Sequence, residues 1–314
     1  MKRARRIMWT ATPTTLDTGT TAAIYRGSPS GEAKAIVHIN HGMAEHAGRY
    51  ERFAAALSDA GYAVIAHDHR GHGQTQNPQS SLGHFGAEGL SGILADLRAV
   101  QKLARDENPN LPIITFGHSM GSIITLNHAL RNPGDTDAIA CWNSGVQGGA
   151  LLAVFRSILK VQKAFKGSDV PSGLARSLTF DTWNKAFAPN RTDFDWLSRD
   201  EGEVDFYIAD PLCGFPVTIG LWLAVSDGIA AGADDAQLAK LPANLPVHLL
   251  GGLDDPCTEK GKAMQNLADR MKARSMSDVT LEQLADTRHE SLNELNRNET
   301  TATFIEWLDH RFGG

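Results

Sequence analysis

Short apolar runs alternate with amphipathic helical patterns over residues 1–145, and this alternation constrains the fold more than any other feature. The apolar runs carry few polar residues, which is typical of strands buried on both faces of a sheet. They lie at residues 35–40, 63–66, 113–116 and 138–142. A strand–helix order repeated in this way predicts an α/β fold, with a mostly parallel sheet and helices on both faces.

The alternation stops after residue 145 and resumes later in the chain. Residues 146–235 contain helical patches, prolines and scattered aromatic residues, but no convincing buried strand. We therefore expect a core formed by residues 1–145 and 236–314, with residues 146–235 inserted as a helical cap. The remaining regular patterns predict an opening hairpin at 6–10 and 21–25, strands at 247–251 and 279–284, and helices at 264–271 and 300–311.

Composition excludes several classes of protein. The 314 residues are 42% hydrophobic and 21% charged, which is ordinary for a globular protein, and a net charge of −6 argues against a nucleic-acid partner. The three cysteines are far apart and odd in number, so they predict buried thiols in a reducing compartment. The basic residues at 2–6 precede no apolar stretch, and no run of about 18 apolar residues occurs. We therefore expect a cytoplasmic protein without an export signal or membrane span.

The segment Gly117-His118-Ser119-Met120-Gly121 carries the strongest chemical signal. It follows the apolar run at 113–116 and precedes a helical pattern at 122–130, which is the context of a nucleophile elbow. The sharp turn would project the Ser119 hydroxyl beyond the sheet, and the flanking glycines would allow a close approach of backbone. With 30 glycines in the chain, the motif alone could arise by chance. Its strand–turn–helix context favours a nucleophilic serine.

A nucleophilic serine needs a base, and the base needs an acid to orient it. Ligands of such sheets bind beyond the carboxyl ends of the strands, so these partners should follow strands. Asp254 and Asp255 follow the strand pattern at 247–251, and His289 follows the one at 279–284. Alone, His289 would suit a structural role, but its order after Ser119 and an aspartate favours catalysis. Asp255 is the preferred acid, and Asp254 stays open as the alternative.

The developing negative charge on an ester oxygen needs backbone N–H donors. The expected donors are Met120, after the nucleophile, and Met43, in the loop that follows the strand at 35–40. The histidines at 67, 69 and 72 could suggest a metal, but no second cluster of ligands at suitable spacing accompanies them. We expect them to pack or to shape the mouth of the site, with no metal and no cofactor.

Three motifs occur in a characteristic order: HGMAEHAGRY at 41–50, DHRGHG at 68–73 and GHSMG at 117–121. Together they resemble the monoacylglycerol lipase and lysophospholipase branch of the α/β-hydrolase fold, which is often grouped with the serine aminopeptidases. The resemblance covers about residues 20–312 and extends to DPLCGF at 210–215. The rest of the cap matches poorly. Ser122 stands where the family usually has glycine.

This resemblance implies Ser119 as the nucleophile, Asp255 as the acid, His289 as the base, and a helical cap over the site. It therefore favours Asp255 over Asp254. We expect a serine ester hydrolase that forms an acyl-enzyme, with a small-molecule ester carrying an acyl chain as substrate. A monoacylglycerol or a lysophospholipid is the expected substrate, and transient contact with a membrane surface is compatible with it.

The residues expected to bind this substrate lie in the core and in the cap. They are Gly42, His118, Leu151, Phe155 and Trp183, although the last three could equally form the core of the cap. Three alternatives stay open: a short-chain carboxylesterase, an aminopeptidase of the same family and a non-catalytic binding protein. An aminopeptidase would need acidic cap residues to hold the substrate amine. The acidic cluster of the cap is Asp193, Asp195, Glu201, Glu203 and Asp205.

Overall fold

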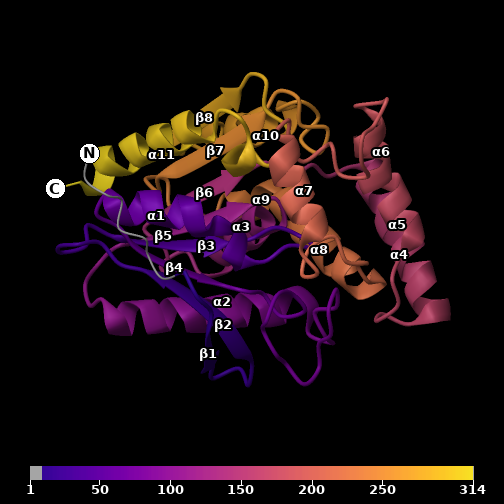
Figure 1. The fold of residues 1–314 in the computed structure, drawn as a ribbon, viewed down its shortest axis with the longest axis horizontal. Coiled ribbons are helices and arrows are strands. Elements are labelled where there is room, and N and C mark those ends of the chain that lie inside the picture. Colours follow the sequence, from indigo (N-terminus) through magenta and orange to yellow (C-terminus); the bar gives the residue numbers. More distant parts are fainter. Residues whose placement is uncertain (1–8, 314) are drawn as a thin grey trace.

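An eight-stranded sheet forms the centre of the protein, whose computed structural model describes residues 9–313 (Figure 1). The strand order is β1-β2-β4-β3-β5-β6-β7-β8, and only the two pairs that involve β2 are antiparallel. The predicted mostly parallel sheet is therefore confirmed. The strands are β1 (Thr12–Thr15), β2 (Thr21–Gly27), β3 (Ile36–Asn40), β4 (Ala63–His67), β5 (Ile113–His118), β6 (Ala138–Trp142), β7 (Val247–Gly252) and β8 (Val279–Leu284).

Helices cover both faces of this sheet, as the apolar runs predict. In β6, Ile139 and Cys141 join one hydrophobic cluster with α2, α3 and α10, whereas Ala140 and Trp142 join another with α1 and α11. Successive strand residues point to opposite faces, so each central strand must be apolar throughout. The helices of the core are η1 (Ala47–Tyr50), α1 (Glu51–Asp59), α2 (Gly89–Glu107), α3 (Met120–Arg131), α10 (Lys262–Lys272), η2 (Ser291–Asn293) and α11 (Arg297–Phe312).

All the regular elements between β6 and β7 are helices. We call residues 146–235 the inserted segment. Its α8 packs against α3 and α2 of the core and against α4, while α4, α5 and α6 lie together beyond the sheet (Figure 1). The helices are α4 (Ala150–Lys166), α5 (Gly173–Leu178), α6 (Phe180–Lys185), α7 (Glu201–Ala209), α8 (Ile219–Gly232) and α9 (Asp235–Leu238).

The opening hairpin differs from the prediction in its first strand. Of the strand expected at 6–10, residues 6–8 lie outside the described residues, as do the basic residues at 2–6, and Trp9 and Thr10 are not in a strand. Trp9 instead packs its ring 5.4 Å from that of Tyr25 and donates its indole N–H to the Ala47 carbonyl at 3.0 Å. These contacts anchor Trp9 to β2 and Ala47, and the first strand begins later, at Thr12 in β1.

Candidate active site

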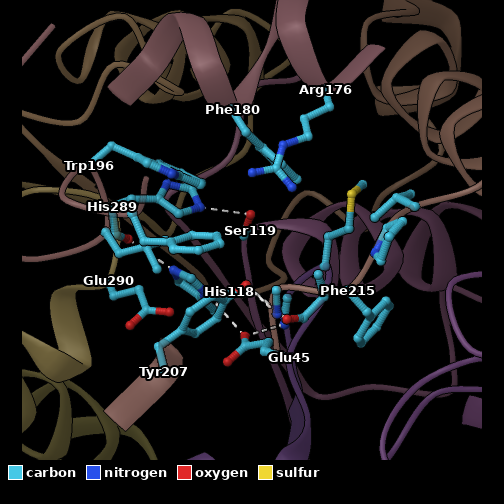
Figure 2. A pocket seen from close by; sticks show the side chains of 18 of the residues that line it. Glu45, His118, Ser119, Arg176, Phe180, Trp196, Tyr207, Phe215, His289 and Glu290 are labelled. Atoms are coloured by element: carbon cyan, nitrogen blue, oxygen red, sulfur yellow. Dashed lines mark hydrogen bonds and ion pairs between the residues drawn. The ribbon is translucent and has the colours of Figure 1, made fainter. Parts of the chain in front are cut away.

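Ser119 occupies a sharp turn between β5 and α3. Its backbone angles are φ 54° and ψ −118°, a region that a residue with a side chain rarely adopts. A Cβ atom on Gly117 would lie 2.1 Å from the Gly121 carbonyl oxygen, and one on Gly121 would lie 2.0 Å from the Asn40 oxygen. The two glycines of the motif are therefore required by the close approach of backbone. The strained turn presents the Ser119 side chain at the end of the sheet (Figure 2).

Hydrogen bonds connect Ser119, His289 and Asp255 in one chain. The Nε2 atom of His289 lies 2.8 Å from the Ser119 Oγ, and its Nδ1 lies 3.0 Å from the Asp255 Oδ2. A carboxylate only accepts, so Nδ1 carries a proton and Nε2 is free to accept the hydroxyl proton. Asp255 is fully buried and also accepts the Cys257 N–H at 2.9 Å. Asp254 instead donates its backbone N–H to the Thr287 carbonyl.

The two expected oxyanion donors lie beside this chain of residues. Gly42 and Met43 line the same pocket as Ser119, and a Cβ on Gly42 would lie 3.4 Å from the Cβ of Ser119. Met120 follows Ser119 as the first residue of α3, where helix N–H groups have no partner within the helix. Within residues 9–313, neither the Met43 N–H nor the Met120 N–H has a protein acceptor. Both remain able to donate to a substrate.

A buried group of charges, which we call the Glu45 cluster, lies beneath the pocket. Arg49 contacts Glu45 at 2.6 Å and forms a bidentate pair with Glu290 at 2.6 and 2.7 Å. Glu45 also accepts the N–H of Gly42 at 2.5 Å and the hydroxyl of Tyr50 at 2.8 Å. Burial would raise the pKa of both carboxyls, but the charge of Arg49 holds them below their usual range. The cluster therefore carries charged carboxylates and fixes the loop that contains Met43.

His118 joins this cluster to His289. Its Nε2 donates to the backbone carbonyl of His289 at 2.9 Å, and its Nδ1 lies 3.6 Å from the Glu45 carboxylate. Burial alone would lower the pKa of His118, but the hydrogen bond and charge of Glu45 raise it above its ordinary value. His118 therefore supports the backbone of His289 and lies beside a carboxylate that favours its protonated form. It also lines the pocket (Figure 2).

The pocket above Ser119 is walled by aromatic and aliphatic residues, most of them from the inserted segment (Figure 2). Its empty volume is about 610 Å³, part of it open to solvent. The lining residues from the inserted segment are Arg176, Phe180, Phe194, Trp196, Leu197, Tyr207, Phe215, Pro216, Val217 and Trp222, together with Gly214.

Three residues expected to bind an acyl chain do not line this pocket. Leu151 lies on α4 and is 84% exposed. The amphipathic pattern of a helix shows that it has an apolar face but not which partner that face contacts. Phe155 packs edge-on against Trp222, and Trp183 lies 5.0 Å from Trp196. These two rings therefore support residues of the wall from behind. The scattered aromatic residues of the sequence signalled an apolar site but not which of them form it.

The histidines at 67, 69 and 72 are buried and packed together with His38 and His41. The rings of His41 and His69 are 4.3 Å apart, and His67 hydrogen-bonds to His38 at 3.1 Å. Burial lowers the pKa of His67 and of His72 to about 4, so both are neutral at pH 7. His69 and His72 pack around His41, which also accepts the backbone N–H of His69 and precedes Gly42 in the chain.

Within residues 9–313, two other groups bring together side chains of the types that bind metals. They are Asp255, Cys257 and His289, and His46, Asp210 and Cys213. In the first group, His289 is engaged with Asp255 and Ser119, and burial raises the pKa of the Cys257 thiol. In the second, His46 pairs with Asp210 at 2.8 Å, and burial raises the pKa of the Cys213 thiol. Neither thiol is therefore disposed to form the thiolate that a metal prefers.

Comparison with known families matches residues 31–296 to the family described as serine aminopeptidase, S33. The chain belongs to this family. It is 30% identical over 289 residues to the monoglyceride lipase of Mus musculus, with 90% of this chain and 85% of that protein covered. It is 33% identical over 282 residues to the monoacylglycerol lipase of Mycolicibacterium smegmatis, covering 90% of each. The predicted family resemblance is confirmed, and the chain is a carboxylic ester hydrolase.

Solved structures agree with this assignment. A lipase in its open form superimposes with a TM-score of 0.85 at 26% identity, covering 96% of this chain and 98% of the other. A carboxyl esterase from Bacillus coagulans also has a TM-score of 0.85, at 22% identity, covering 96% of this chain and 97% of the other, and shares the fold. The α/β-hydrolase fold is confirmed. None of the helices within residues 9–313 combines the length and apolar character needed to cross a membrane.

Proposed function

We propose that the protein hydrolyses monoacylglycerols and related lysophospholipid esters through an acyl-enzyme on Ser119. In this mechanism His289 takes the hydroxyl proton while the Ser119 Oγ attacks the ester carbonyl carbon. The alcohol then leaves with the proton from His289. In the second half, His289 takes a proton from a water molecule that attacks the acyl carbon, and the acid is released as the proton returns to Ser119. The hydrogen-bonded chain from Ser119 through His289 to Asp255 is the observation that carries this proposal.

The roles of the remaining residues follow from the charges that develop. Asp255 holds His289 with a proton on Nδ1 and stabilises the imidazolium that forms. The backbone N–H groups of Met43 and Met120 would donate to the carbonyl oxygen as it becomes negative. Removal of one such donor typically costs about 100- to 1,000-fold in rate. The bond from Gly42 to Glu45 keeps the Met43 loop in place for this purpose.

Residues 146–235 act as a cap over the site in this proposal. They supply most of the apolar pocket wall, which suits an acyl chain. The relatives named monoglyceride and monoacylglycerol lipase support the same substrate class. In this proposal the cap helices move apart when a long-chain substrate binds, because the aromatic side chains of the wall pack close together over Ser119. Phe180 and Trp222, whose rings are 5.4 Å apart, are part of the wall that would open.

The aminopeptidase alternative gains no support from the acidic cluster of the cap. Arg191 pairs with Asp205 at 2.7 Å and with Glu201 at 4.0 Å, and Arg52 pairs with Glu203. Asp195 accepts the backbone N–H groups of residues 191 and 192. Asp193 is 83% exposed and lies 3.9 Å from Arg176, and no member of the cluster lines the pocket. These carboxylates therefore stabilise the inserted segment and are not disposed to hold a substrate amine.

Hydrolysis of a chain-length series tests the substrate assignment. We expect p-nitrophenyl esters and monoacylglycerols with medium or long chains to be hydrolysed best, and activity to be lost in Ser119→Ala. A fluorophosphonate probe should label the wild-type protein and leave Ser119→Ala unlabelled. A sharp optimum at acetyl to butyryl esters would replace the lipid assignment with a short-chain esterase. Folded wild-type protein that takes up no probe would indicate a non-catalytic binding protein.

A further inference from the structure

The apolar pocket wall contains a positive side chain that hydrolysis of a neutral ester does not require. Of the pocket-lining residues, Arg176 is the sole lysine or arginine. It lies on α5 in the inserted segment, and its guanidinium extends into the pocket region where Ser119 and Phe180 lie (Figure 2). Guanidinium donors at the wall of an otherwise apolar pocket indicate a polar feature of the ligand.

The guanidinium of Arg176 retains donors for a ligand. Its Nε donates to the Asp181 Oδ1 at 3.2 Å, and one terminal nitrogen lies 3.9 Å from Asp193, beyond hydrogen-bonding distance. Among the described residues, no acceptor is hydrogen-bonded to either terminal nitrogen. The Asp181 and Asp193 side chains are 43% and 83% exposed, so water screens their pull on Arg176. The planar edge of the guanidinium is therefore available.

The other charged side chains at the pocket are engaged within the Glu45 cluster. The carboxylates of Glu45 and Glu290 both pair with the guanidinium of Arg49, and Glu45 also lies 3.6 Å from the Nδ1 of His118. The side chains of these four residues are only 4–11% exposed. Arg176 therefore provides the charge that a substrate in the pocket can meet.

We propose that Arg176 binds an anionic group of the substrate, a phosphate or a carboxylate, and selects charged monoacyl esters over neutral ones. The arginine fork matches the two oxygens of either anion, which an ammonium group does not. The inference rests on the proposed function, because it concerns a substrate bound over Ser119. A phosphate would lie on the alcohol side of the ester, whereas a carboxylate could end the acyl side.

Two matched pairs of substrates separate these sources. Lauroylglycerol and its phosphate monoester differ only by the phosphate on the alcohol, and p-nitrophenyl valerate and p-nitrophenyl hemiglutarate differ by an acyl-side carboxylate. For each pair, kcat/KM is measured in the wild type and in Arg176→Gln. Arg191→Gln is the matched control, since the Arg191 side chain is 39% exposed against 38% for Arg176 and lies outside the pocket lining.

In Arg176→Gln we expect the anionic-to-neutral ratio of kcat/KM to fall about tenfold in one of the two pairs. Because Arg176 is partly exposed, its hydrogen bond to an anion should contribute at the lower end of the range for hydrogen bonds to charged groups. The pair that responds identifies the anion. The proposal would be overturned if Arg176→Gln left the anionic-to-neutral ratio of kcat/KM unchanged in both pairs, whether both substrates lost activity equally or neither did. It would also be overturned if Arg191→Gln lowered this ratio as much as Arg176→Gln.

Binding measured without turnover keeps the two proposals distinguishable. In Ser119→Ala, fluorescence of the pocket residues Trp196 and Trp222 reports the binding of lauroylglycerol phosphate, lauroylglycerol and glutarate. We expect the added Arg176→Gln change to weaken the binding of an anionic ligand and to spare lauroylglycerol. If the protein with Ser119 intact hydrolyses no ester, that binding result would reject the proposed function and retain the role of Arg176. Ester hydrolysis that does not depend on Arg176 would support the proposed function and reject the role of Arg176.

Discussion

Replacement of Arg49 with methionine tests whether the Glu45 cluster stabilises the protein through charge. Arg49 is the arginine shared by Glu45 and Glu290, and the three side chains are 11%, 4% and 6% exposed. Methionine keeps much of the length of the side chain and so preserves packing against the ring of Tyr207, 4.8 Å from the guanidinium. The variant leaves two buried carboxylates without their counter-ion.

We expect this change to lower the free energy of unfolding by about 3–5 kcal/mol at pH 7, which is typical when one partner of a buried ion pair is removed. Hydrogen bonds that remain place the value toward the lower end. Glu45 keeps the N–H of Gly42 and the hydroxyl of Tyr50, and Glu290 keeps the amide of Asn293. Arg26→Met is the control, because Arg26 also holds a glutamate, Glu107, but the pair is 34% and 43% exposed. Arg26→Met should lower the free energy of unfolding by only about 0–1 kcal/mol.

Urea unfolding followed by tryptophan fluorescence, repeated from pH 7 to pH 3, measures both costs. In the wild type the pKa values of Glu45 and Glu290 lie below their ordinary range, so their stabilisation is present above about pH 4.3 and is lost as the pH falls through the folded values. In Arg49→Met, burial raises these pKa values, and the folded state gains protons instead. The difference in the free energy of unfolding between the wild type and Arg49→Met should therefore become smaller as the pH falls. A cost below about 1 kcal/mol at pH 7, equal to that of the exposed control, would refute the reasoning.

Two further outcomes concern residues around Ser119. Asp255→Asn should lower kcat on a monoacylglycerol by about 10³- to 10⁴-fold, because the amide no longer holds His289 in the productive tautomer. Asp254→Asn is its control, and equal losses in the two variants would contradict the assignment of the acid. Glu45→Gln should lower the pKa of His118 in an NMR titration, because burial remains while the charge that raises this pKa is removed. An unchanged pKa would contradict a charged His118.

The parts of the fold that depend on short-range pattern were predictable. The run at 113–116 became β5 (Ile113–His118), and the pattern at 122–130 became α3 (Met120–Arg131). Strands buried on both faces need continuous apolar residues, and a turn with overlapping backbone needs glycine, so both leave local signatures. The first strand of the hairpin was misplaced, because the burial of Trp9 against Tyr25 depends on a contact that no local pattern carries.

The candidate site shows the same division. The motif around Ser119 and the order Ser119, Asp255, His289 pointed to a nucleophile with an acid and a base. The choice between Asp254 and Asp255 needed the turn after β7, where Asp255 is buried against His289 and Asp254 bonds to the Thr287 backbone. Adjacent residues on a turn point in different directions, and the sequence does not say which direction faces the base.

The sequence by itself determined the chain order of strands and helices, the family and the serine elbow, because each is encoded within a few neighbouring residues. Tertiary structure alone decided which residues form the pocket and which charges meet. Arg49 and Glu290 are separated by 241 positions along the chain yet form a bidentate pair. Leu151 faces solvent although its helix is amphipathic, and Arg176 lines the pocket although no motif marks it. Such contacts depend on how distant elements pack, and packing is a property of the whole chain.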